Sequence, residues 1–190
     1  MPFLRSWGFA LVWGLFAIVW IARSRSANQT EASEPRSSRL IHLSLLAAAF
    51  VLIFASGLRL GSLDVELLGP SDALFVVGLT IALLGVVFMI WARQHLGLYW
   101  SGTITLKEGH RLIRTGPYRF VRHPIYSGFV LAIAGSGLAQ GNLRGLLAIA
   151  IAVTAYARKI RLEESWLAAH FGEEYARFQR EVRALIPLVW

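Results

Sequence analysis

The stretch "ALFVVGLTIALLGVVFMIW", residues 73–91, decides the fold class of this chain. Its nineteen residues include no charged side chain, and a helix of that length can cross about 30 Å of hydrocarbon. The rest of the sequence agrees, because 56% of the 190 residues are hydrophobic and only 16% are charged. Ordinary soluble domains have fewer apolar and more charged residues. The sequence therefore predicts an all-α integral membrane protein.

Four further apolar runs accompany this one, at residues 7–22, 40–60, 124–139 and 143–157. We therefore expect about five transmembrane helices. Only "QGN" separates the last two runs, so they should form a helical hairpin. The linker that follows the first run, residues 23–39, is polar and rich in Ser. Such composition predicts a mobile connection.

Two long segments are too polar to span a membrane. The loop at residues 92–123 also contains many aromatic residues, and long loops of this kind inside compact domains are usually functional. In the tail after Ala157, apolar residues recur at helical intervals, which predicts one or two amphipathic helices with Gly172 as a possible break. We expect a single membrane domain over 1–190, in which 1–91 hold three spans and the linker, and 92–190 form the catalytic region.

The basic residues predict the orientation. Sixteen of the nineteen Lys and Arg residues lie in the linker, the loop or the tail. By the positive-inside rule, these segments are cytoplasmic and the N-terminus is outside, in an inner or endoplasmic reticulum membrane. The net charge of +8 lies beside apolar runs, which favours anionic lipid head groups over nucleic acid as partners.

Metal and thiol chemistry find little support in the sequence. The chain has no cysteine, which excludes a catalytic thiol and thiolate metal ligands. Its five histidines show no paired ligand spacing. We expect no metal.

A polar cluster, "GPYRFVRHPIYSGF" at residues 116–129, stands at the mouth of the fourth run. Pro124 fits the first position of a helix, so this helix should begin there. Its positive end, beside Arg122 and His123, would suit a carboxylate or a phosphate. Gly128, one turn further on, would let a ligand or another helix come close. The alternative is that these residues serve only topology, capping and packing.

Glu163 and Glu164 follow the fifth run directly, at the same cytoplasmic level. Acidic residues contribute little to topology, although a solvated helix turn is an alternative explanation. Together with Arg122 and His123 they would form a bipolar pocket. Such a pocket offers cations to a carboxylate, and carboxylates to an amine or a sulfonium.

Two motifs, "GPYRFVRHPIYSG" and "EESWLAAHFGEEYARFQREVRALIP", resemble the isoprenylcysteine carboxyl methyltransferase family, which is similar in turn to the phospholipid N-methyltransferases. The resemblance covers about residues 94–187. It implies a membrane methyltransferase that uses S-adenosylmethionine, with a cytoplasmic cofactor pocket built from the loop and the C-terminal helices. By position, the resemblance assigns to this pocket Leu112, Ile113, Gly116, Tyr118, Arg122, His123, Tyr126, Gly128 and Glu163.

The same resemblance implies a cation near the methyl acceptor, shortly before the glutamate pair. Arg158, Lys159 and Arg161 all qualify, and we favour Arg158. Glu164 would take a proton if the acceptor is an amine. The sequence leaves open whether the acceptor is an isoprenylcysteine-type carboxylate, a phospholipid amine or another lipophilic group. We expect it to enter sideways from the bilayer, because glycines around the final hairpin leave little bulk to seal the bundle.

Two other functions stay open on the sequence alone. One is a membrane reductase of the sterol reductase type that uses NADPH, and the other is a membrane scaffold without enzymatic activity. The identity of the cofactor that binds would discriminate among the three.

Overall fold

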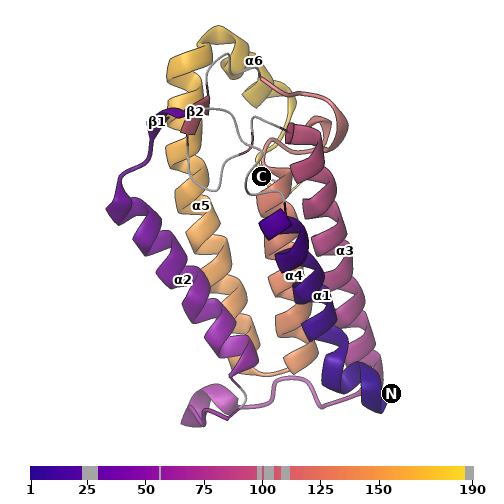
Figure 1. Cartoon of the computed structure of the whole chain (residues 1–190). Coiled ribbons are helices and arrows are strands. Elements are labelled where there is room, and N and C mark those ends of the chain that lie inside the picture. Colours follow the sequence, from indigo (N-terminus) through magenta and orange to yellow (C-terminus); the bar gives the residue numbers. More distant parts are fainter. Residues whose placement is uncertain (23–29, 56, 98–99, 101–104, 108–111, 187–190) are drawn as a thin grey trace.

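A computed structural model of the chain describes residues 1–22, 30–55, 57–97, 100, 105–107 and 112–186, with the backbone alone for 30–33 and 105–107. Five long helices run alongside one another, and each reverses the direction of the one before (Figure 1). A sixth, shorter helix lies across one end. The helices are α1 (Pro2–Ala22), α2 (Arg36–Phe54), α3 (Asp72–Leu96), α4 (Pro124–Gln140), α5 (Leu143–Phe171) and α6 (Glu173–Glu181).

Local sequence signals set the ends of the last three helices. α4 begins at Pro124, as predicted, because proline fits the first helical position. The turn to α5 places Gly141 at φ +65°, and the Asn142 side chain then caps α5 by accepting a hydrogen bond from the Gly145 N–H at 3.0 Å. The break predicted at Gly172 is confirmed, since this residue has φ +53° between α5 and α6.

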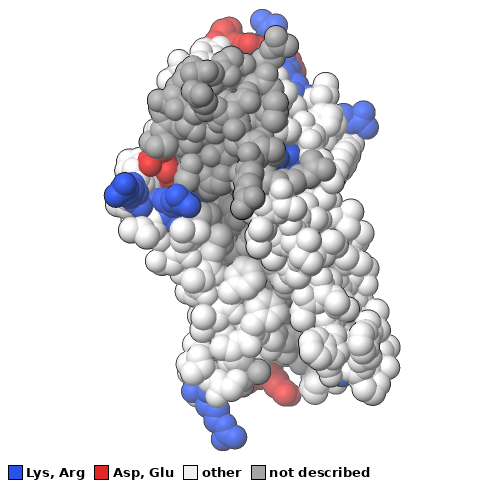
Figure 2. Space-filling model, in the orientation of Figure 1, with Lys and Arg blue, Asp and Glu red and all other residues white. Residues whose placement is uncertain are grey.

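The lengths of the helices and the positions of the charged side chains are those of an integral membrane protein. α1, α2 and α3 are each long and apolar enough to cross a membrane. α4 is 17 residues long, and α5, at 29 residues, continues well beyond the apolar run at 143–157. On the face drawn in Figure 2, the charged side chains that are described gather at the two ends and leave an uncharged belt between them. The exact number of spans stays a prediction.

Glycines bring three of the helices into backbone contact. A Cβ on Gly85 of α3 would lie 2.6 Å from the carbonyl oxygen of Gly128 on α4, and a Cβ on Gly137 of α4 would lie 2.7 Å from the carbonyl oxygen of Gly145 on α5. Side chains larger than hydrogen do not fit there. The expectation that these glycines leave a lateral opening at the hairpin is therefore wrong, because they let the two backbones touch.

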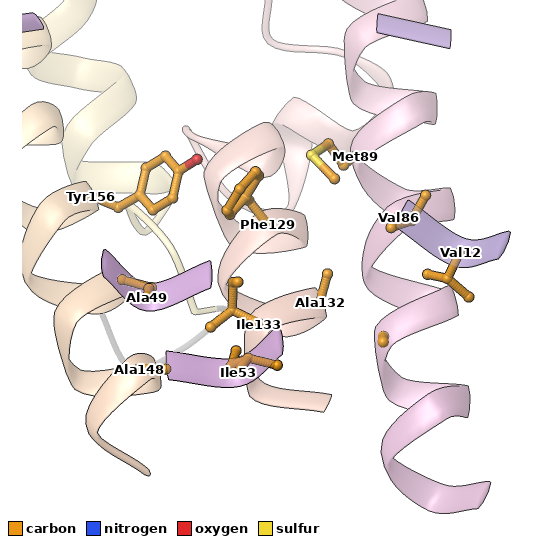
Figure 3. Packing of buried hydrophobic residues seen from close by; sticks show 12 residues of the cluster. Val12, Ala49, Ile53, Val86, Met89, Phe129, Ala132, Ile133, Ala148 and Tyr156 are labelled. Carbon is orange, nitrogen blue, oxygen red and sulfur yellow. The ribbon is translucent and has the colours of Figure 1, made fainter. Parts of the chain in front are cut away.

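Aromatic rings fill the centre of the bundle. Trp13 of α1 packs against Phe50 of α2 and Phe129 of α4, with ring centroids 4.6 and 5.4 Å apart, respectively. Phe129 in turn lies 5.3 Å from the ring of Tyr156 on α5. Figure 3 shows Phe129 and Tyr156 at the same level, with the smaller Ala132 and Ile133 below Phe129 on α4. Such tilted ring pairs add to the stability gained from burial, so α1 and α2 belong to the same core as α4 and α5.

One end of the bundle gathers segments that are distant in sequence. Strand β1 (Thr30–Ser33) pairs antiparallel with β2 (Thr105–Lys107), and both lie at the end where α6 lies (Figure 1). The expectation of a mobile linker is thus wrong for the β1 residues, which form backbone pairs with the loop. The part of that linker at residues 23–29 lies outside the described residues.

At the opposite end, Arg144 joins three segments. Its guanidinium donates to the carbonyl oxygens of Ala55 at 2.9 Å and Leu58 at 3.1 Å, and to Asp64 at 3.1 Å. Ala55 is the C-cap residue of α2, and Leu58 lies three residues beyond it. Arg144 therefore caps α2 from the first turn of α5, and its charge is buried in doing so.

Candidate functional site

The C-terminal tail covers the beginning of α4. The backbone N–H of Arg122 donates to the Arg183 carbonyl at 2.8 Å, and that of His123 donates to the Ala184 carbonyl at 3.0 Å. The Ser127 hydroxyl donates to the carbonyl of Leu185 at 2.6 Å. We call residues 182–185 the tail strand. The N–H groups just before α4 are therefore already bonded to the protein itself.

A partly buried ion pair joins α4, α5 and α6. Arg122 donates from Nε and Nη2 to Oε1 of Glu164, at 2.8 and 2.6 Å, and the two side chains are only 10% and 17% exposed. Arg122 also donates to the carbonyls of Gln179 and Val182. Gln179 donates from its amide to the other Glu164 oxygen, at 3.0 Å. The pair thus fixes the tail strand and α6 against the end of α5.

These contacts strongly favour the ionised form of Glu164. Burial by itself raises the pKa of this carboxyl, but the hydrogen bonds and electrostatic attraction of His123 and Arg122 outweigh it, and the pKa falls from 4.5 to about 2. His123 Nε2 lies 3.1 Å from Oε1 of Glu164. A carboxylate with so low a pKa is a weak base, which argues against Glu164 as a proton acceptor and favours a positioning role.

Glu163 has fewer partners and is more open. Its Oε2 accepts a hydrogen bond from the Tyr126 hydroxyl at 2.6 Å and lies 3.6 Å from Nδ1 of His123. The rings of Tyr126 and His123 stack at 5.4 Å, within 5° of parallel. The Glu163 side chain is 28% exposed, against 17% for Glu164. Of the two carboxylates, Glu163 is the one better placed to meet a ligand.

Comparison with known proteins identifies a family whose model matches the region that contains this cluster. Residues 76–169 match the isoprenylcysteine carboxyl methyltransferase (ICMT) family, and this range contains the whole of α4 and both glutamates. Through this region, 94 of the 190 residues, the chain is similar to the ICMT family. The resemblance noted in the two motifs is confirmed.

Relatives from plants, fungi and bacteria match part of this chain. Protein-S-isoprenylcysteine O-methyltransferase B of Arabidopsis thaliana is 31% identical over 115 residues, which are 59% of this chain and 58% of the relative. Protein-S-isoprenylcysteine O-methyltransferase of Schizosaccharomyces pombe is 32% identical over 43% of this chain and 35% of its own. The cobalt-zinc-cadmium resistance protein CzcN of Cupriavidus metallidurans is 35% identical over 57% and 49%. The chain thus spans about a third to three fifths of these relatives.

Among the three candidate cations before the glutamates, Lys159 lies on the Tyr126 side of α5. Its side chain is buried, with Nζ 5.5 Å from the centroid of the Tyr126 ring. It lies four residues before Glu163, so the two project from the same face of α5. That spacing favours Lys159, and the choice of Arg158 stays a prediction. Arg158 donates instead to the carbonyl and hydroxyl of Ser38 on α2, at 3.3 and 3.1 Å.

The candidate cofactor residues before α4 pack mainly against the protein itself. Gly116 has φ +59°, and a Cβ there would lie 2.7 Å from the ring of His95, so this turn requires glycine. Tyr118 is buried and stacks at 6.4 Å on the same ring. Burial, and then the charge of Glu163, raise the pKa of Tyr118. Leu112 and Ile113 are half-buried, and their place along an adenosine stays a prediction.

Gly128 faces helix α3. A Cβ on Gly128 would lie 2.6 Å from the Gly85 carbonyl oxygen and 2.8 Å from Cβ of Met89. Of the two alternatives that the sequence allowed, a ligand or another helix, the geometry favours the helix. Its assignment to the cofactor has no support in these contacts.

The cluster therefore differs from the bipolar pocket that we expected, because not all of its charged groups are open to a ligand. Arg122 and Glu164 are joined to each other, so that pair holds the site together. Glu163, Tyr126, His123 and Lys159 form the part that has capacity left for a ligand. A carboxylate of this kind suits the ammonium or sulfonium of S-adenosylmethionine, and a buried lysine suits a carboxylate.

Proposed function

We propose that this chain is an integral membrane methyltransferase that uses S-adenosylmethionine and methylates a lipophilic carboxylate of the isoprenylcysteine type. The observation that carries the proposal is the position of the cluster. Arg122, His123, Tyr126, Glu163 and Glu164 meet at the polar end of an apolar bundle, within the region that matches the ICMT family. Two of the relatives described above are named O-methyltransferases.

When bound, S-adenosylmethionine would supply a methyl group on a sulfonium: the acceptor oxygen would bond to the methyl carbon as the carbon–sulfur bond breaks and the neutral thioether leaves. Glu163 would hold the ammonium of its amino-acid end, oriented by the Tyr126 hydroxyl and by His123. Arg122 and Glu164 would keep Glu163 in place by fixing α5 against α4. Leu112, Ile113 and Tyr118 would lie beside the adenosine, as the family resemblance implies. Positioning and removal of water would then supply most of the rate acceleration.

The chemistry of the cluster supports a carboxylate acceptor over an amine. A carboxylate attacks without losing a proton, whereas an ammonium must first lose one. Glu164, with its pKa of about 2, is a poor group to receive such a proton. Lys159 would hold the acceptor carboxylate next to Tyr126, in place of Arg158, which contacts α2.

The first experiment tests the cofactor and its carboxylate. S-adenosylmethionine should raise the melting temperature of the purified protein in detergent, and NADPH should not. By calorimetry, Glu163→Gln should weaken cofactor binding by about 1–3 kcal/mol, the usual range for a charged hydrogen bond. Glu174→Gln, at an exposed position of α6, is the matched control. Stabilisation by NADPH alone would replace the proposal with the reductase alternative.

The second experiment tests the acceptor. Methyl transfer from radiolabelled S-adenosylmethionine should occur to prenylated cysteine acids in liposomes and fail with aminophospholipids. Water-soluble analogues of the acids should react much more slowly, because a lipophilic acceptor reaches the site from the bilayer. Equal activity on the soluble and the lipidic acids would contradict a lipophilic site, and activity on the amines alone would contradict a carboxylate site.

We also propose one membrane domain over residues 1–190, with the N-terminus outside and α6 in the cytoplasm. Support comes from the excess of basic residues in the linker, the loop and the tail. Because the chain has no cysteine, single cysteines report topology cleanly. Arg177→Cys on α6 should react with an impermeant maleimide only from the cytoplasmic side, and Ser62→Cys only from outside. Reaction of both from one side would refute the five-span topology.

A further inference from the structure

The outer face of α5 carries a hollow that the proposed reaction does not use. It is lined by Val153, Thr154, Ala157, Arg158, Arg161, Leu162 and Ser165. The face of α5 that is buried in the bundle, with Ala148, Ala152 and Ala155, lies on the other side of the helix. The hollow therefore faces outward, towards whatever surrounds the bundle.

The lining changes character along the helix. Val153 and Ala157 belong to the apolar run of α5, and Arg158 and Arg161 come directly after it. Val153 and Arg161 are eight residues apart, which is about 12 Å along a helix axis. This is the order of groups that a phospholipid presents at the boundary of a membrane, with acyl chain first and phosphate next.

The two arginines are available for an anion. Arg158 is held by Ser38, whose hydroxyl in turn donates to Glu34 at 2.8 Å, and Arg161 is exposed. Among the described residues, neither forms an ion pair with a carboxylate. Ser38 leaves part of the Arg158 guanidinium uncommitted, since its contacts involve Nη1 and Nη2 once each and this group has five N–H donors. Basic pockets beside transmembrane helices on the cytoplasmic side suit anionic head groups.

We propose that this hollow binds an anionic phospholipid of the surrounding leaflet, with its phosphate on Arg158 and Arg161 and the start of one acyl chain along Ala157 and Val153. The bound lipid would be a structural partner and not the methyl acceptor. Glu163 and Lys159 project from α5 towards α4 and Tyr126, away from this face. Because Arg158 also contacts Ser38 of α2, the lipid would reinforce the contact between α2 and α5.

The test uses the full chain, delipidated in detergent, and measures lipid affinity by native mass spectrometry. Phosphatidylglycerol and phosphatidylcholine with identical acyl chains are the probes. The protein should bind phosphatidylglycerol more tightly. Arg161→Gln should reduce that affinity about fivefold, and Arg158→Gln/Arg161→Gln about 25-fold, as expected for one favourable surface charge contact each.

The matched control is Arg36→Gln/Arg39→Gln, which removes the same charge from exposed positions in the first turn of α2. It should change the affinity less than twofold. An equal loss in this control would reduce the hollow to general electrostatic attraction and overturn the proposal. Arg161→Gln leaves the Ser38 contact intact, so an unchanged affinity in this variant would overturn it as well. The lipid should stay bound in millimolar inorganic phosphate, because its acyl chain adds affinity, and its displacement there would overturn the proposal.

Discussion

Glu164 makes the stability of the folded protein depend on pH in the acidic range. The carboxyl has a pKa of about 2 in the folded chain and 4.5 without its partners, so protons bind the unfolded chain more tightly. Its contribution to stability is fully present above pH 4.5 and disappears as the pH falls towards 2. At 1.36 kcal/mol for each pKa unit, this interval corresponds to about 3 kcal/mol. The Glu164 side chain is mostly buried, so solvent screening removes little of this.

The perturbation is Glu164→Gln, which keeps the shape of the side chain and removes its charge. At pH 7 the variant should be about 3 kcal/mol less stable than the parent protein, because Arg122 and His123 lose their ionic partner. Between pH 4.5 and 2 the parent should lose this difference and the variant should not. The free energy of unfolding in detergent, followed by far-ultraviolet circular dichroism against denaturant, gives both quantities.

Glu174→Gln controls for the loss of one negative charge at an exposed position of the same region. It should keep the parent's dependence on pH. If Glu164→Gln retained that dependence as well, the acid sensitivity would belong to other groups. The arrangement of Arg122, His123 and Glu164 would then have to be wrong.

Two further predictions concern the stability of the bundle, with melting temperature in detergent as the measurement. Arg144→Met should cost about 3 kcal/mol, because it leaves Asp64 and the last carbonyls of α2 without their buried partner, while Arg59→Met at an exposed position should change little. Gly135→Ala should cost about 1–3 kcal/mol, since its Cβ would meet the backbone of α3. Gly14→Ala, where a Cβ meets nothing within 4 Å, should be at least neutral; equal melting temperatures for the two alanine variants would contradict the close helix contact.

The sequence predicts the bundle well where single residues restrict the backbone. Pro124 begins α4 because proline fixes the dihedral of a first helical position, and Gly172 separates α5 from α6 because it adopts a positive φ. The apolar runs likewise locate α1, α2 and α3, since each must bury a hydrophobic surface along its length. These are local properties, readable without knowledge of neighbours.

Contacts between distant segments could not be predicted from local sequence. The pairing of β1 with β2, and of the tail strand with residues 122–123, depends on backbone groups that have no sequence signature. Helical phase could have placed Lys159 on the side of Glu163, yet the direction of Arg158 is decided by Ser38 on α2. Gly128 was ambiguous for the same reason, because a missing side chain does not reveal what takes its place.

The bonds between the tail strand and Arg122 and His123 imply an order of assembly during synthesis. Residues 183 and 184 are made about sixty positions after their partners, when α1 to α4 have already left the ribosome. Until then the Arg122 guanidinium has neither Glu164 nor the Val182 carbonyl, and it stays in water at the membrane surface. The helices can therefore enter the bilayer before the polar end exists, and a chain cut before Val182 would be inserted without the contacts that join Arg122 and His123 to the tail strand. The polar cluster is therefore the last part of the newly made protein to form.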